Sequence, residues 1–420
     1  MANNLSSNIT RPLAKIFLEA FESSRVVTKT VNTQLLSGKF NPSTGTKVDF
    51  KRPHDYNSIR STGGDISAAA KSDIIAGKAT GTVQPYFTSA TEWSNIQEAL
   101  ELDQLDQILE PMARRLVTDL ELDLAKFMRI NTGLNYGARG TAVDAWSDVA
   151  GAGAMMDSVG VPMSDNKYYL MNPFTTTSLA SAQSGLNAAD GLVRTAFEKA
   201  QIASNFGGMK ALTSNALSSY TSGSTTDRSG DLKTAPDATY VTAKDTMQQT
   251  MVIETLGTGT IEAGDQIQIA GVNRLNIATR QLILDATGAA VPWTGTVLSV
   301  VTIAGNEATV VVSGAAIFEA NGQYNNVDAA PAAGAVVTIL GAAGAVYQPN
   351  LFYTEQAFGL GTVKLPKLYS TDTVATTSDG MSIRVSKYSD GDANTQKIRF
   401  DLLPAYACFN PNFAGQGYGV

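Results

Sequence analysis

The stretch GTGTIEAGDQIQIAGV, residues 257–272, gathers four glycines around a Gly-Asp pair, and glycines at this density can cradle a phosphate. A phosphate loop requires Gly-x-x-x-x-Gly-Lys-Ser/Thr, or Gly-x-Gly-x-x-Gly at the start of a helix. Gly257 and Gly259 are followed by neither a third glycine in phase nor a lysine. Asp265 adds negative charge, and QIQIAGV alternates like a strand. We therefore interpret EAGD as a tight turn between two strands.

Carboxylates are the second group that could do chemistry, since a pair of them is what a glycoside hydrolase uses. Eight acids lie in a helical stretch over residues 95–131, but four bases accompany them, which favours a solvated or partner-facing surface. His54 is the only histidine and lies in the polar context KRPHDY, while Cys408 is the only cysteine. We interpret Cys408 as a small buried apolar residue. The sequence thus predicts no enzyme activity, no cofactor and no metal site.

The distribution of charge is more informative than any single motif. Residues 1–60 contain nine Lys or Arg against four Asp or Glu, a balance of +5, whereas residues 83–130 contain four against nine, a balance of −5. A basic loop that reaches an acidic helix on a neighbouring copy would form a contact that repeats around a ring. The residues predicted for this contact are Lys47, Lys51, Arg52, Arg60, Asp119, Glu121 and Asp123.

Two elements must position those charges. Apolar residues at three-four spacing predict a long helix over about 95–131, with Pro111 as a point where it bends or where a new helix begins. Residues 41–82 are poor in apolar residues and rich in Gly, Ser and Thr. A connection of that length usually exists to contact something, so we expect an extended loop.

Strand-like runs recur about every ten residues between 232 and 346, which predicts a small antiparallel barrel or sandwich. The runs are TYVTA, TMVIETL, QIQIAG, QLILD, TVLSVVTI, EATVVVS and AVVTIL. Helices are expected around 142–160 and 188–202, a linker over 213–231, and two final strands in MSIRVSKY and QKIRFDLLPAYACF. The fold class is therefore α+β, with the β module inserted into a larger domain.

The order of these parts resembles the major coat proteins of short-tailed (podovirus) bacteriophages of the Salmonella- and Shigella-phage group. The most specific stretches are FKRPHDYNSIR (50–60), ARRLVTDLELDLAKFM (113–128), LVRTAFEKAQIASNFGGMKAL (192–212), QPNLFYTEQAFGLGTVKLPKL (348–368) and YSDGDANTQKIRFDLLPAYACFNPNFAGQ (388–416). The resemblance covers nearly the whole chain. It implies the tailed-phage and herpesvirus capsid fold, with an inserted β-barrel domain.

The resemblance also implies a division into parts and a set of partners. The parts are an N-terminal arm (1–40), an extended loop (41–82), a peripheral domain with the spine helix (83–135, completed by 380–420), a central domain (136–222, completed by 347–379) and the barrel (223–346). Copies of the subunit would assemble with scaffolding and portal proteins in the host cytoplasm into a procapsid, typically with T=7 symmetry. That shell would expand as double-stranded DNA is packaged, and the protein would end in the virion.

Two other classes of protein remain open. A secreted adhesin or surface-layer protein would explain the low charged fraction of 16% and the abundance of Ser, Thr and Gly, but the start MANNLSSNIT has no secretory pattern. A carbohydrate hydrolase would explain the acids and the β module, but no residues define a site. A membrane protein is not expected, since Pro331 and glycines interrupt the longest apolar stretch, residues 329–346.

Overall fold

A computed structural model describes residues 15, 17–35, 40, 45–94, 105–184, 199, 202–369 and 372–418. The chain forms two compact units, each built from segments that are far apart in the sequence. The first unit contains Met1–Val48, Gly81–Phe127 and Phe358–Ala407, and the second contains Asp49–Thr80, Met128–Ala357 and Cys408–Val420. The predicted division into five parts stays a prediction.

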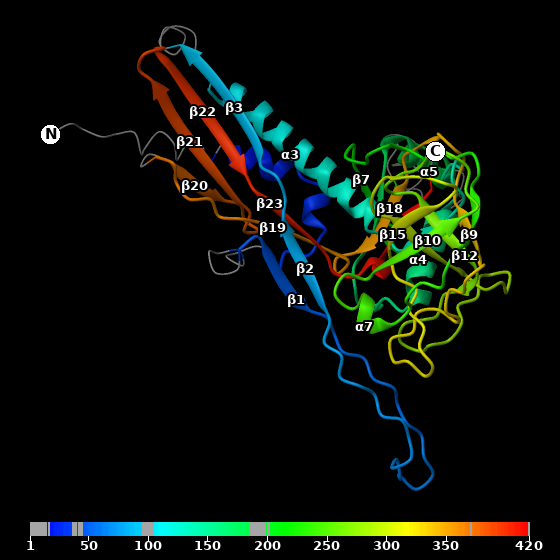
Figure 1. The fold of residues 1–420 in the computed structure, drawn as a ribbon. Coiled ribbons are helices and arrows are strands. Elements are labelled where there is room, and N and C mark those ends of the chain that lie inside the picture. The colour runs from blue at the N-terminus through cyan, green and yellow to red at the C-terminus, as the bar shows by residue number, and fades with distance from the viewer. Residues whose placement is uncertain are drawn as a thin grey trace. The chain divides into compact units, whose positions relative to one another are not determined.

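The first unit is built around a long helix and an antiparallel sheet (Figure 1). The sheet has the order β20 (Thr373–Thr376), β21 (Ser382–Asp390), β22 (Thr395–Leu402) and β3 (Phe87–Ser94). The Phe400 ring of β22 stacks on Phe17, with 3.9 Å between ring centroids, and thereby fixes the helix over residues 17–24 to this sheet. The short 3-10 helix η1 (Val27–Lys29) follows.

The long helix α3 runs from Leu105 to Ile130 and continues through Pro111. The alternative that a new helix begins at Pro111 is therefore wrong. Its buried stripe includes Leu109, Leu116 and Leu124, at the three-four spacing that places side chains on one helix face. The predicted start of this helix, residues 95–104, lies outside the described residues, as does most of the helix predicted over 188–202.

The second unit contains a six-stranded mixed sheet. Its order is β4 (Leu134–Tyr136), β24 (Ala414–Gly417), β18 (Asn350–Thr354), β5 (Lys167–Met171), β7 (Met209–Thr213) and β6 (Asn205–Phe206). Helices α4 (Trp146–Val159) and α5 (Pro173–Ser184) accompany it, and the 3-10 helix η2 (Pro411–Phe413) precedes β24. Val149 and Met156 of α4 pack with Tyr169 and Phe352 of the sheet in one apolar cluster. α4 confirms the helix predicted over 142–160.

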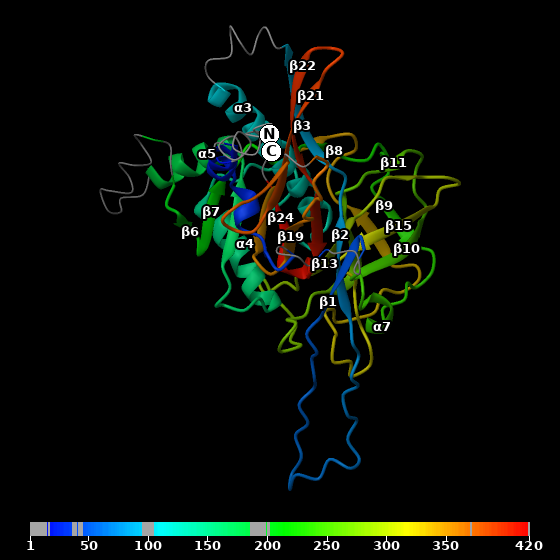
Figure 2. The same ribbon diagram turned by 90° about the vertical axis from the view of Figure 1, so that its left-hand side faces the viewer.

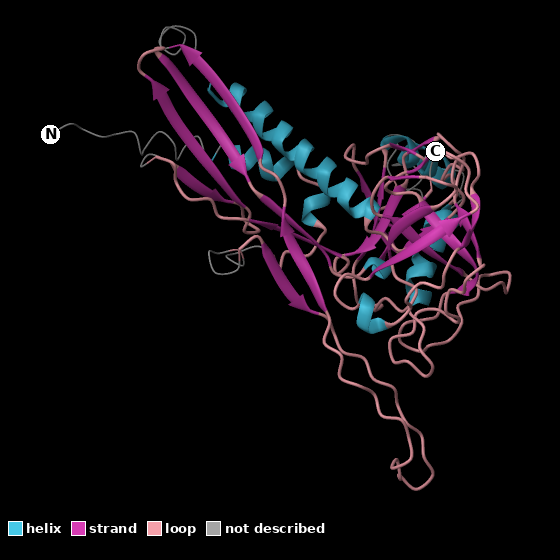
Figure 3. Ribbon diagram, in the orientation of Figure 1, coloured by secondary structure: helices cyan, strands magenta, loops and turns pink. Residues whose placement is uncertain are grey.

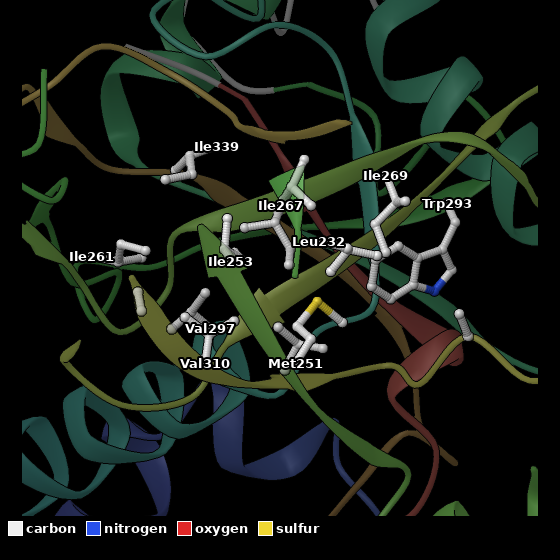
Figure 4. Packing of buried hydrophobic residues seen from close by; sticks show 14 of the residues in the cluster. Leu232, Met251, Ile253, Ile261, Ile267, Ile269, Trp293, Val297, Val310 and Ile339 are labelled. Carbon is white, nitrogen blue, oxygen red and sulfur yellow. The ribbon is translucent and has the colours of Figure 1, made fainter. Parts of the chain in front are cut away.

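The β module is a closed six-stranded antiparallel barrel, as the sequence predicts. Its order is β10 (Gln248–Glu254), β15 (Ala308–Ser313), β13 (Pro292–Val297), β12 (Gln266–Asn273), β16 (Val336–Ile339) and β9 (Ser229–Leu232), with the small pair β11 (Thr260–Ile261) and β14 (Val301–Thr302) beside it. Alternate residues of each strand point inward, so Met251, Ile267 and Trp293 meet in the core (Figure 4). The chain reaches and leaves the barrel through the antiparallel pair β8 (Tyr220–Thr221) and β17 (Val346–Tyr347), as expected for an insertion.

Three local predictions around the barrel are wrong. TYVTA forms the short helix α7 (Tyr240–Ala243) instead of a strand. QLILD makes isolated bridges, Leu282 to Leu275 and Leu284 to Ala290, because it lies in an irregular excursion between β12 and β13. The segment 213–231, predicted as a linker, contains β8 and the start of β9, which are elements of the barrel and its stem.

Candidate assembly surface

The extended loop lies between β1 (Lys47–Lys51) and β2 (Lys78–Val83), and these strands form a sheet with β23 (Pro404–Cys408) and β19 (Phe358–Thr362). Residues 52–77 contain no regular strand and form one long excursion (Figures 2 and 3). Residues 56–68 are all exposed, and so are Lys47, Lys51 and Arg60. His54 is also exposed, as its polar context predicts.

Arg52 differs from the other predicted basic residues, because its own chain already binds it. Its Nε donates to the carbonyl oxygen of Lys78 at 3.0 Å, and its Nη1 donates to the carbonyl oxygen of Phe409. Burial lowers the pKa of Arg52 from its usual range. We therefore assign Arg52 to the base of the loop instead of to a contact with a neighbour.

The three predicted acidic residues of α3 lie in different environments. Asp119 is about one-third exposed and pairs with Arg115 one turn earlier, with 3.0 Å between Oδ2 and Nε. Asp123 is half-buried and accepts a hydrogen bond from the Tyr406 hydroxyl at 3.0 Å. Burial, followed by the charge of Asp123, raises the pKa of Tyr406. Both carboxylates thus have partners within their own unit.

Glu121 is buried, with 4% of its surface exposed, and this corrects its prediction as a surface contact. Its carboxylate accepts from the backbone N–H of Val26, and from the N–H and hydroxyl of Thr28 at 3.3 and 3.4 Å. Burial raises its pKa, although these hydrogen bonds act in the opposite direction. Glu121 therefore holds the N-terminal segment against α3.

The Gly-Asp turn contains a functional residue that the sequence did not reveal. Gly264 takes a φ of +101°, and Asp265, the residue just before β12, is fully buried. The Asp265 carboxylate accepts from the Ser222 hydroxyl at 2.8 Å, and from the backbone N–H groups of Gly223 and Glu262 at 2.9 and 3.0 Å. Asp265 is thus a junction between the barrel turn and the chain that leads into the barrel.

Two arginines provide the countercharge for Asp265. The Nη1 atom of Arg139 lies 3.4 Å from its Oδ1, and the Nη2 atom of Arg228 lies 3.8 Å from the same oxygen. The guanidinium of Arg139 also lies over the Tyr418 ring, 4.9 Å from its centroid, and that of Arg129 lies 4.1 Å from the Tyr220 centroid. This junction of charges and aromatic rings fastens the barrel to the body of its unit.

Among the described residues, no cluster of His, Cys, Asp and Glu could hold a metal ion. In the same part of the chain, every helix is too short or too polar to cross a membrane. The Cys408 thiol is half-buried, lies 3.7 Å from the Asn131 carbonyl oxygen, and has its pKa raised to about 12 by burial.

The family of the chain is shown by comparison with known sequences. The family model described as P22 coat protein, gene protein 5, matches residues 1–419. The chain is 47% identical to the major capsid protein of Acyrthosiphon pisum secondary endosymbiont phage 1, with 100% of both chains covered. Among solved structures, the capsid of the cyanophage P-SCSP1u has a TM-score of 0.45 at 13% identity, covering 93% of this chain and 86% of that one. A structure from Mycobacterium phage Che8 also has a TM-score of 0.45, at 12% identity, with 93% and 92% covered.

Proposed function

The chain belongs to the P22 coat protein family of phage capsid proteins, and we propose that copies of it assemble into an icosahedral procapsid of T=7 symmetry. The observation that carries this proposal is the family match over residues 1–419, together with a relative, aligned over its whole length, that is described as a major capsid protein. Assembly would use a scaffolding protein and a portal protein, and the shell would expand as it encloses double-stranded DNA. The proposed source is a short-tailed phage of the Salmonella- and Shigella-phage group.

The proposed contact between subunits uses the basic loop and the acidic face of α3. Lys47, Lys51 and Arg60 are exposed, and the acceptors left for them on a neighbouring copy are Asp119 and Asp123. Each exposed pair would contribute only about 0.2–1 kcal/mol. Repetition around every capsomer makes the sum matter for assembly, while a single folded subunit hardly depends on it.

Assembly itself is the test of the proposed function. The purified chain is mixed with scaffolding protein and followed by size-exclusion chromatography with light scattering and by electron microscopy. Closed shells, or rings the size of a capsomer, are the expected result. A stable monomer under every condition would contradict a role as a coat protein. Hydrolysis of a carbohydrate by that monomer would favour the enzyme alternative.

A further inference from the structure

We propose that the inserted barrel positions the extended loop of its own subunit, with Arg280 as the positioning residue at the base of the loop. The two segments of that base, residues 52–57 and 72–77, contact the barrel insertion and belong with it to the second unit of the chain. The barrel side of the contact consists of α7, the turn that contains Arg280, and the segment 319–326 that follows β15. The two segments of the loop base make different contacts with the barrel.

Arg280 binds the outgoing segment of the loop, residues 52–57. Its guanidinium forms an ion pair with Asp55, and it also donates to the carbonyl oxygens of Gln323 and, at 2.8 Å, Asn325. Asn57, two residues beyond Asp55, donates its Nδ2 to the carbonyl oxygen of Asn321 at 2.9 Å. One guanidinium thus joins the loop to the 319–326 segment, with Nη2 on Asp55 and Gln323 and Nη1 on Asn325, and its fixed planar fork sets the direction of these contacts in a way that a rotating ammonium group does not.

The returning segment of the loop, residues 72–77, is held through its backbone carbonyl groups. The Asp73 carbonyl oxygen accepts from Nε2 of Gln323 at 2.6 Å, and the Ala76 carbonyl oxygen accepts from Nζ of Lys244 at 3.3 Å. Ile75 packs against the small apolar cluster that contains Tyr240, Met247 and Ile317, and Tyr324 is a further member of its edge. Because these contacts are made to backbone carbonyl groups, they hold the main chain of the returning segment and do not depend on the side chains of Asp73 and Ala76.

The side chains that make these contacts are themselves held in place. The Tyr240 and Tyr324 rings stack, with 3.6 Å between centroids and 12° between planes. Arg280 has a φ of +58°, and its backbone N–H donates to the carbonyl oxygen of Asn276 at 2.8 Å, so a tight turn presents its side chain. A residue in this left-handed conformation persists only where its surroundings stabilise it. The barrel therefore provides a rigid support.

The support ends at Asn57 and Ser72, where the Asn57 N–H donates to the Ser72 hydroxyl at 2.9 Å. Beyond that point residues 58–68 are exposed, and they include Arg60. A loop fixed at its base and exposed along its length has a set direction, which lowers the entropy lost when the loop binds a partner. The consequence for assembly rests on the proposed function, whereas the support within one subunit does not.

Spin labels measure the direction of the loop in the unassembled subunit. The labels are placed at Ser58→Cys, next to the supported base of the loop, and Ser299→Cys on the barrel, both exposed positions, in a Cys408→Ala background. Pulsed electron paramagnetic resonance should give one narrow distance distribution for the otherwise unchanged protein. Arg280→Asn keeps a residue type that tolerates the left-handed conformation and removes the guanidinium. It should abolish the narrow distribution. Asp55→Asn removes the carboxylate that pairs with Arg280 and should broaden the distribution as well.

The control is Lys233→Asn, which removes the exposed barrel ion pair between Lys233 and Glu307. It should leave the distribution unchanged. A narrow distribution in both Arg280→Asn and Asp55→Asn would overturn the proposal, and so would equal broadening in the control. If the unchanged protein forms no shells with scaffolding protein, the proposed function fails. The distance measurement still decides the role of Arg280, because it is made before assembly.

Discussion

Asp265 and Arg139 form an ion pair in which both side chains are almost completely buried, with 3.4 Å between Oδ1 and Nη1. Charges removed from water in this way contribute to stability only when both partners and their hydrogen bonds are present. Asp265 meets that requirement with three further donors, from Ser222, Gly223 and Glu262. The glycine-rich turn thus binds arginine guanidinium groups and backbone N–H groups through its own carboxylate, whereas a phosphate loop would bind an anion.

Replacing Asp265 by Ala should destabilise the subunit strongly. The change leaves the buried Arg139 without its carboxylate and leaves two backbone N–H groups unpaired, so we expect a loss of about 3–5 kcal/mol in the free energy of unfolding. Urea unfolding followed by circular dichroism measures it. The control is Asp285→Ala, which removes an exposed carboxylate that caps a turn through Thr287 and Ala289. That variant should lose much less, because water can replace the exposed carboxylate as the acceptor. Equal losses would contradict the assigned role of the junction.

The barrel, residues 223–346, should fold as an isolated fragment, because its strands close on themselves around their own core. It should be less stable than in the whole chain, since it lacks Arg139 and Arg129 and exposes Ile283, which packs in the apolar cluster of α4 and the mixed sheet. Far-UV circular dichroism and the dispersion of amide proton signals test this. A fragment without dispersed signals would contradict a self-sufficient barrel. In a folded fragment, Asp265→Ala should cost less than in the whole chain.

The sequence allowed the elements with a regular period to be predicted. The alternation in QIQIAG and EATVVVS identified barrel strands, and the three-four spacing identified α3. TYVTA has a strand-like composition, yet its apolar residues serve a different purpose: Tyr240 packs on Tyr324 from one helical turn. Composition over five residues does not distinguish these outcomes, because tertiary contacts override local preference.

The roles of single charged residues were harder to predict. The partners of Asp265 come from residues 139, 222, 223 and 228, and only the folded chain brings these together. The burial of Glu121 could have been found, since it follows Val117 by four residues and thus lies on the apolar stripe of α3. Arg52 and Lys51 are adjacent and both carry a positive charge, and no sequence feature separates the internal one from the exposed one.

Glu121 should give the subunit a characteristic pH dependence. Its pKa is raised in the folded state, so the folded protein binds that proton more tightly than the unfolded chain does. The contribution of this group to stability is therefore greatest below the usual Glu pKa and falls as the pH rises through the raised one. Unfolding free energies of the wild type and Glu121→Gln are compared from about pH 4 to pH 8, a range that begins near the usual pKa of Glu. The advantage of the wild type should decrease with rising pH; an increase would contradict the raised pKa.

Substitutions at the adjacent residues Lys51 and Arg52 should have different effects on the stability of the folded subunit. Lys51→Glu changes an exposed side chain, so the free energy of unfolding should stay within about 0.5 kcal/mol of the wild type. Arg52→Glu removes donors from the carbonyl oxygens of Lys78 and Phe409, and should destabilise the subunit by about 1–3 kcal/mol.

If Lys51 faces an acid such as Asp119 on a neighbouring subunit, Lys51→Glu should still impair shell formation, most clearly at low salt where screening is weakest. Light scattering of assembly at two salt concentrations measures this. Normal assembly of Lys51→Glu at low salt would remove Lys51 from the contact, and restored assembly in the double variant Lys51→Glu with Asp119→Lys would identify its partner.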